Sequence, residues 1–157
     1  MKYFIFTLLL ILFFTIPFSH SMAAKNPDIV ITAERFEVEE AGKKANATGG
    51  VTLTQGPLVI TADEVIYQRA NKKIEFESKS KRISFRYKKI QGSCGKALYL
   101  VSQKKIILME KPFLDRGEDH IEGEKIEFNV ATQRISIVGN STIRFQEGSL
   151  DQLEENP

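Results

Sequence analysis

The chain has 157 residues, with 22 basic and 20 acidic side chains and a formal net charge of +2 at pH 7. This near balance gives no argument for a nucleic-acid partner, and the length fits one domain with a modest core. The single cysteine excludes an internal disulfide, so sheet pairing and packing must stabilise the fold.

The N-terminal residues have the pattern of a secretory signal. Lys2 precedes an apolar stretch over 4–18, and small residues follow at 21–23. The stretch contains Thr and Pro and is shorter than the about 20 apolar residues of a membrane-spanning helix. We expect residues 1–23 to be cleaved and the protein to be periplasmic. The alternative is an uncleaved inner-membrane anchor.

A pattern of about 30 residues recurs after this segment. Its four copies begin at Ile31, Ile60, Gly92 and Ile121. In each copy, two arms of alternating apolar residues flank a short polar turn. The turns are Gly42-Lys43-Lys44, Asn71-Lys72-Lys73, Gln103-Lys104-Lys105 and Thr132-Gln133-Arg134. Such a unit predicts a strand, a turn and a second strand.

The alternation has a period of two residues, which is typical of half-buried strands. We expect about a dozen antiparallel strands. One hairpin cannot bury its apolar face alone, so the expected fold is an all-β, open, twisted, β-jellyroll-like roll. The apolar positions change parity between Ile60 and Val65, which predicts a bulge near Ala62-Asp63. The domain is expected to span 24–146, followed by a disordered acidic tail at 147–157.

The inward-facing side chains of this roll are expected either to bind lipid or to fill an ordinary core. The candidates are Val38, Leu53, Ile60, Val65, Tyr67, Ile74, Phe76, Phe85, Tyr99, Ile106, Leu108, Ile126, Phe128 and Ile135. Ile83 and Ile143 are also expected to face inward. The first and last strands would keep unpaired backbone groups, which favours head-to-tail assembly. A lipid carrier and a structural β-repeat protein with a filled interior both remain open.

The segments Ile31–Val38 (ITAERFEV), Gly49–Gly56 (GGVTLTQG) and Ile60–Tyr67 (ITADEVIY) resemble the LptA/OstA-like lipopolysaccharide-export family. The resemblance covers about residues 28–145 and weakens in the third copy, which begins Gly92-Ser-Cys94-Gly95. It implies a jellyroll whose interior binds the acyl chains of lipopolysaccharide. It also implies stacks of such rolls between an inner-membrane export complex, which includes an ATPase, and an outer-membrane translocon.

Among the members of that family, the periplasmic bridge fits the sequence best. The chain is too short to include the large barrel of the translocon member, and the expected signal disfavours the inner-membrane-anchored member. A protein of this kind makes and breaks no bonds, so we expect no enzyme activity. The expected partners are lipopolysaccharide, the β domains of the export complex and translocon, and further copies of the chain.

No cofactor, metal or catalytic dyad is expected. His20 lies in the signal, and His120 stands beside Asp119 without Cys or His ligands at metal-binding spacing. Cys94 is expected to be a small, partly buried thiol. Acidic residues recur at equivalent positions of the repeat, which favours turn or solvent-facing roles. These residues are Asp63, Glu64, Glu122 and Glu124.

The segment from Arg69 to Lys89 is strongly basic, since only Glu75 and Glu77 are acidic. Its basic residues are Arg69, Lys72, Lys73, Lys79, Lys81, Arg82, Arg86, Lys88 and Lys89. In the periplasm, phosphorylated lipid headgroups are a more suitable partner for such a segment than nucleic acid. The alternative is a solvated strand face.

Overall fold

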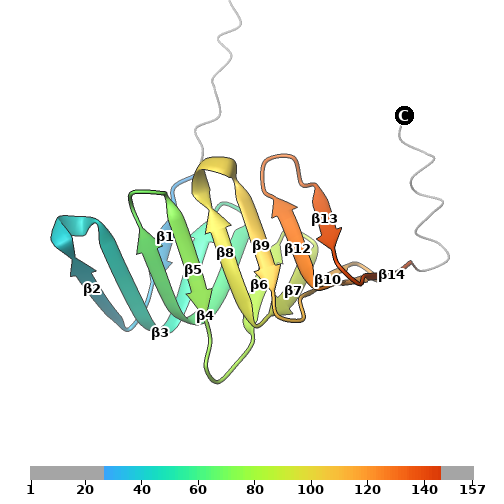
Figure 1. The fold of residues 1–157 in the computed structure, drawn as a ribbon, viewed down its shortest axis with the longest axis horizontal. Coiled ribbons are helices and arrows are strands. Elements are labelled where there is room, and N and C mark those ends of the chain that lie inside the picture. Colours follow the sequence, from blue (N-terminus) through green and yellow to red (C-terminus); the bar gives the residue numbers. More distant parts are fainter. Residues whose placement is uncertain (1–26, 146–157) are drawn as a thin grey trace, which may run out of the picture.

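The computed structural model describes residues 27–145. In this part of the chain, fourteen strands form one antiparallel sheet, and two short 3₁₀ segments lie in its turns (Figure 1). The first seven strands are β1 (Val30–Thr32), β2 (Arg35–Glu39), β3 (Lys44–Gln55), β4 (Leu58–Gln68), β5 (Lys73–Glu77), β6 (Ile83–Tyr87) and β7 (Ile90–Cys94). The others are β8 (Lys96–Leu100), β9 (Lys105–Met109), β10 (Phe113–Arg116), β11 (Asp119–Glu122), β12 (Lys125–Asn129), β13 (Ile135–Val138) and β14 (Thr142–Arg144). The 3₁₀ segments are η1 (Glu40–Gly42) and η2 (Val101–Gln103).

The expected signal at 1–23 and the acidic tail at 147–157 lie outside the described residues. Within 27–145 there is no α-helix. Consequently, no helix in this part of the chain is long and apolar enough to cross a membrane.

The sheet is folded into two facing layers (Figure 1). The front layer has the strand order β2-β3-β4-β5-β8-β9-β12-β13. The rear layer has the order β1-β3-β4-β6-β7-β10-β11-β14. The long strands β3 and β4 belong to both layers, because their two halves pair with different neighbours. The expected all-β, jellyroll-like roll is confirmed.

The two layers diverge at a bulge between β3 and β4. Gly49 and Gly50 lie opposite the single residue Asp63, and pairing resumes between Val51 and Ala62. Both glycines have positive φ, at 84° and 58°, a conformation that costs least for a residue without Cβ. The bulge lies where the parity change predicts it, but the extra residue is in β3 rather than in β4.

Along the repeat, the chain forms a hairpin in one layer, crosses to the other layer and forms the next hairpin there. At one long edge, which we call the corner edge, the chain crosses between layers. These crossings lie at 33–34, 49–50, 63, 78–82, 95, 110–112, 123–124 and 139–141. At the opposite edge, which we call the seam, each layer makes hairpin turns. The front turns are 40–43, 69–72, 101–104 and 130–134, and the rear turns are 56–57, 88–89 and 117–118.

Successive front turns are hydrogen-bonded to one another at the same two positions of the repeat. In each bond, a backbone N–H of one turn donates to a backbone carbonyl of the preceding turn. The bonds join Arg69 to Lys43 (2.9 Å), Val101 to Lys72 (3.1 Å) and Val130 to Lys104 (2.8 Å). The front turns therefore form one continuous row along the seam.

Aromatic side chains from the two layers meet inside the roll. Phe85 of the rear layer and Phe128 of the front layer pack edge to face, with ring centroids 5.4 Å apart. Tyr87 packs on Phe128 at 5.0 Å. Such contacts add about 0.5–1.5 kcal/mol per pair beyond the apolar area that they bury.

Close backbone approach explains the glycines of the third copy. A Cβ at Gly92 would lie 2.0 Å from the carbonyl oxygen of Phe113, in the neighbouring strand β10. A Cβ at Gly95 would lie 2.7 Å from the Cβ of Glu110. The third copy departs from the pattern of the others because no side chain fits at these two positions.

Candidate functional site

The apolar interior between the two layers contains most of the residues expected there. Eleven are buried: Leu53, Ile60, Val65, Ile74, Phe76, Phe85, Tyr99, Ile106, Leu108, Ile126 and Phe128. Tyr67 and Ile135 are partly buried and pack against this core, and Ile83 is buried as expected. Whether these side chains bind lipid remains a prediction.

The core also contains apolar residues that were not among the candidates. They include Val51, Leu58, Ile90, Leu114 and Ile121. Leu58 lies two residues before Ile60 and Val51 two before Leu53, so extending the period-two pattern along the same strands would have found them. Leu114 gives no such signal, because its strand β10 has only four residues.

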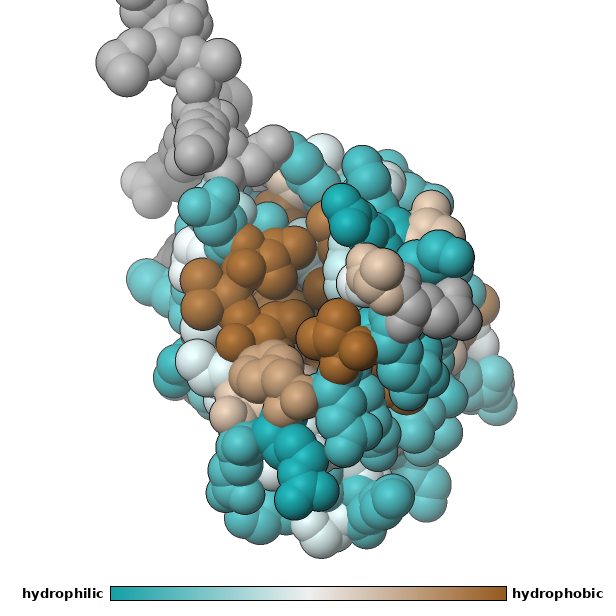
Figure 2. Space-filling view, turned by 90° about the vertical axis from the view of Figure 1, so that its left-hand side faces the viewer, coloured by the Kyte–Doolittle hydropathy of each residue, from teal (hydrophilic) through white to brown (hydrophobic). Residues whose placement is uncertain are grey.

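Val38 lies on the inner face as expected, but it is wrong as part of a filled core, because 65% of it is exposed. It pairs with Ala45, and Phe36 pairs with the buried Ala47, so both side chains lie on the inner face of the front layer. They are uncovered because β2 is the last strand of its layer. Figure 2 shows apolar side chains gathered at this end of the roll and largely surrounded by hydrophilic residues.

The C-terminal end of the roll also exposes part of its inner face. Ile143 of β14 pairs with the buried Ile121 and so faces inward as expected, but it is 44% exposed and does not belong to the buried core. Ile135 and Ile137 of β13 are only partly buried. The reason is the same at both ends, since β13 and β14 are the last strands of their layers.

Two tyrosine hydroxyl groups join the layers at the seam. Tyr99 of the front layer donates to Gln55 Oε1 at 2.6 Å, and Tyr87 of the rear layer donates to the Val130 carbonyl at 3.3 Å. Burial raises the pKa of Tyr99. Beside these bonds lies a recess of about 320 Å³, whose lining includes both tyrosines, Val101 and Lys104.

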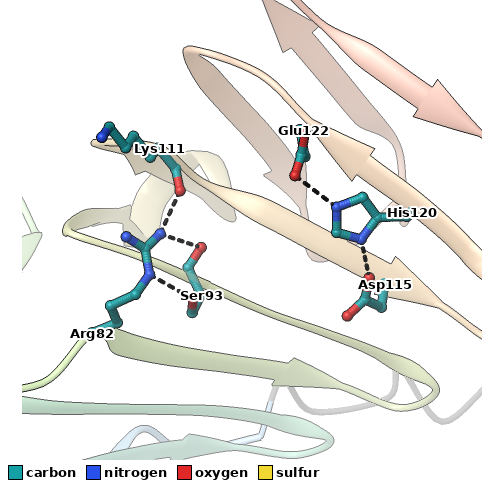
Figure 3. Close-up of polar contacts among 6 residues, drawn as sticks. All are labelled: Arg82, Ser93, Lys111, Asp115, His120 and Glu122. Atoms are coloured by element: carbon teal, nitrogen blue, oxygen red, sulfur yellow. Dashed lines mark hydrogen bonds and ion pairs between the residues drawn. The ribbon is translucent and has the colours of Figure 1, made fainter.

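The corner edge is held by bonds to the backbone. The Asp63 carboxylate accepts hydrogen bonds from the backbone N–H groups of Lys79 (2.9 Å) and Ser80 (3.1 Å), and from the Ser80 hydroxyl (3.0 Å). The bonds from Ser80 are the main reason that the pKa of Asp63 is lowered. The Arg82 guanidinium donates to Ser93 Oγ at 2.8 Å and to the Lys111 carbonyl (Figure 3).

His120 lies on the outer face of the rear layer, between two carboxylates (Figure 3). Its Nδ1 is 2.5 Å from Asp115 Oδ1, and its Nε2 is 2.9 Å from Glu122 Oε1. The hydrogen bond to Glu122, followed by that to Asp115, raises the pKa of His120. The two carboxylates lie on opposite sides of the ring, so they cannot converge with it on one ion. Asp119, the sequence neighbour, pairs with Arg116 instead.

Cys94 is buried, and this burial raises the pKa of its thiol to about 12. A thiol with so high a pKa is not a nucleophile near neutral pH. Within residues 27–145, no group of three or more His, Cys, Asp or Glu side chains is placed to hold a metal ion.

The basic residues between Arg69 and Lys89 do not form one face. Arg69 and Lys72 lie in a front turn at the seam, and Lys88 and Lys89 in a rear turn. Lys79, Lys81 and Arg82 lie in the crossing at 78–82 of the corner edge, where Arg82 holds two neighbouring segments together. The segment therefore supplies positive charge to both long edges of the roll.

Two antiparallel layers around a continuous apolar interior, open at both ends, define an open β-jellyroll. Residues 30–134 match the family model described as LptA/(LptD N-terminal domain) LPS transport protein. The chain belongs to this family, as its sequence resemblance predicts.

A solved structure has the same fold. It is the crystal structure of LptH, the LptA homologous periplasmic component of the conserved lipopolysaccharide transport device from Pseudomonas aeruginosa. The similarity has a TM-score of 0.68 at 17% sequence identity and covers 76% of this chain and 96% of LptH. No curated protein sequence matches the chain significantly.

Proposed function

We propose that this protein is a periplasmic carrier that holds the acyl chains of lipopolysaccharide between its two layers. In this proposal residues 1–23 are a cleaved signal, 24–146 form the carrier domain, and the lipid passes from the inner to the outer membrane. The observation that carries the proposal is an apolar interior that reaches solvent at both ends of the roll, in a member of a lipopolysaccharide transport family.

The free energy of an exposed acyl chain explains why a carrier must enclose it. An acyl chain of about a dozen carbons costs on the order of 10 kcal/mol in water, at about 0.8 kcal/mol per methylene. The interior is closely packed in this structure, so an entering chain must separate the layers. At the seam the layers are joined by the side-chain hydrogen bonds of Tyr87 and Tyr99, and no strand within residues 27–145 crosses between them there.

Stacking of rolls would keep the apolar path continuous between subunits. Phe36 and Val38 at one end, and Ile143 at the other, present inner-face apolar surface beside strands that lack a further neighbour. Such edges can pair with a second copy, or with similar domains of an export complex and a translocon. Covering them removes both the exposed apolar surface and the unpaired backbone groups.

The packed interior favours a second candidate function, that of a structural β-repeat protein whose core never opens. Both functions predict the same apolar lining. They differ in whether lipid reaches it.

Photo-crosslinking in living cells distinguishes the two functions. A photoreactive phenylalanine derivative would replace Tyr67, Phe76 or Phe128 on the inner face, and Glu75 or Glu127 on the outer face of the same layer as a matched control. A carrier is expected to give lipopolysaccharide adducts at the inner positions only. Adducts at none of the inner positions, in variants that remain folded, would reject the carrier and favour the structural protein.

A further inference from the structure

Three lysines at the seam adopt a backbone conformation that lysine rarely takes. Lys72, Lys88 and Lys104 have φ of 49°, 54° and 51°, in the left-handed region. A residue with Cβ costs roughly 1 kcal/mol there, whereas glycine and asparagine adopt it more readily. Lys111 is a fourth such lysine, but it lies at the corner edge and binds Arg82 through its carbonyl. Ala41 and Gln133, in the other two front turns, also have positive φ, at 52° and 58°, so the conformation belongs to the turns. Backbone preference does not explain why lysine occupies three of these positions.

Two of the seam lysines lie at the recess between the layers, and the third lies in the neighbouring front turn. Lys104 lines the recess. The Lys88 ammonium lies 5.5 Å from the centroid of the Tyr87 ring, which also lines it. Lys72 belongs to the preceding front turn, whose backbone is bonded to this one: the Lys72 carbonyl accepts the N–H of Val101, a further lining residue. Positive charge from the front layer (Lys104) and from the rear layer (Lys88) thus lies beside this recess.

The seam differs in charge from the outer face of the front layer. On that face, basic side chains pair with carboxylates: Lys73 with Glu75 at 2.7 Å, Lys96 with Glu77 at 3.2 Å and Lys105 with Glu127 at 3.1 Å. The seven seam turns together contain seven basic residues and two acidic ones, Glu40 and Glu118, and the turns 69–72, 88–89, 101–104 and 130–134 contain no Asp or Glu. The seam therefore has an excess of positive charge that the solvated outer face lacks.

We propose that the seam lysines bind the phosphate groups of an acylated, phosphorylated lipid whose chains enter between the layers. This inference rests on the proposed carrier function and adds a headgroup site to it. Ammonium groups make charge-assisted hydrogen bonds to phosphate oxygens from flexible stems, which suits a headgroup that stays in water. The acyl chains would lie beneath, where Tyr87 and Tyr99 close the recess.

The left-handed conformation of the three seam lysines allows a substitution that removes their charge without destabilising the fold. Asparagine tolerates this conformation and is uncharged, so replacing all three seam lysines is expected to leave the fold intact. The test variant is Lys72→Asn, Lys88→Asn and Lys104→Asn. A matched control removes the same charge from the outer face of the front layer: Lys73→Gln, Lys105→Gln and Lys125→Gln.

Binding of bisphosphorylated lipid A and of chemically dephosphorylated lipid A, each in detergent micelles, would be measured by microscale thermophoresis. The seam variant is expected to bind the phosphorylated lipid about tenfold more weakly or worse, as loss of even one charge-assisted bond implies. Its binding of the dephosphorylated lipid should equal that of the parent protein. The outer-face control should bind both lipids as the parent does.

The possible results separate this inference from the carrier function. Unchanged affinity of the seam variant for the phosphorylated lipid, or equal losses in both triple variants, overturns the headgroup site while the carrier stands. A parent protein that binds neither lipid overturns the carrier function and the headgroup site together. Inorganic phosphate alone should leave the melting temperature unchanged, and specific stabilisation of the parent by it would replace the lipid site with a free-anion site.

Discussion

The corner edge and the seam join the same two layers by different means. At the corner edge the chain itself crosses, and polar groups reinforce the crossings: Asp63 binds backbone N–H groups of the 78–82 segment, and the Gly95 N–H donates to the carbonyls of Met109 (3.2 Å) and Glu110 (3.0 Å). At the seam each layer turns back on itself, and the tyrosine hydroxyl groups of Tyr87 and Tyr99 reach the other layer.

This difference indicates how the roll can open. At the corner edge the chain runs continuously from one layer to the other. Separating the layers there would therefore require the crossings to unfold and would expose buried backbone groups, each of which costs about 1–3 kcal/mol. Separating them at the seam breaks the hydrogen bonds of Tyr87 and Tyr99 and then exposes apolar surface, which an acyl chain would cover in the carrier that we propose. In the carrier that we propose, the corner edge would be the hinge side and the seam the opening side.

Gly95→Ala is expected to have the largest effect, because its Cβ would lie 2.7 Å from the Cβ of Glu110 at the corner edge. Overpacking of this kind costs about 1–3 kcal/mol. Urea unfolding measures the loss, and faster labelling of the buried Cys94 thiol reports opening of this edge. Glu110 has a positive φ of 62°, so adding Glu110→Gly should restore stability. A Gly95→Ala variant that is as stable as the parent would contradict the close packing at the corner edge.

Tyr99→Phe is expected to cost less, about 1 kcal/mol, since it removes one hydrogen bond and leaves the ring in place. The melting temperature and the midpoint of urea unfolding should both fall slightly. Cys94 labelling should keep the parent rate, because the corner edge stays closed. Labelling as fast as in Gly95→Ala would show that the two edges open together.

Acid should weaken the corner edge through Asp63. The pKa of this carboxyl is lowered in the folded protein, so its stabilising effect is fully present above the ordinary value of 3.8 and is lost as the pH falls through the folded value. Asp63→Asn should therefore melt below the parent at neutral pH, and the gap should narrow on acidification. A gap independent of pH would assign the effect to packing.

His120 should give the smallest effect and serves as a reference away from both edges. Its pKa is raised in the folded protein, so its pairing with Glu122 and Asp115 stabilises fully below the ordinary value of 6.5 and is lost as the pH rises through the folded value. The melting temperature of the parent should fall slightly over that range, and His120→Gln should remove this slope. Cys94 labelling should not change in this variant.

Local pattern was sufficient to predict the strands and most of the core. Alternation around Ile60, Phe85 and Phe128 reports which side of a strand faces inward, and the polar turns report where each hairpin reverses. Alternation does not report where a layer ends. Val38 and Ile143 have inward parity, yet they are exposed because no further strand covers them.

The seam could not be predicted from the sequence for a related reason. Tyr99 and Gln55 are far apart in the chain, and their contact depends on how one layer folds over the other. The left-handed conformation of Lys72 and Lys104 is equally hidden, because lysine gives no signal for it. The sequence does show the excess of basic residues from Arg69 to Lys89, although their division between two edges needs the fold.

The hydrogen bonds between successive front turns would allow the roll to contain more repeats. Each bond joins equivalent positions of neighbouring repeats, so an inserted repeat would meet its neighbours through the same contacts as those already present. One more unit would lengthen each layer by two strands, or about 10 Å. It would leave the terminal strands unchanged. The architecture can therefore grow by duplication within one gene, and longer rolls could span a given distance with fewer subunits.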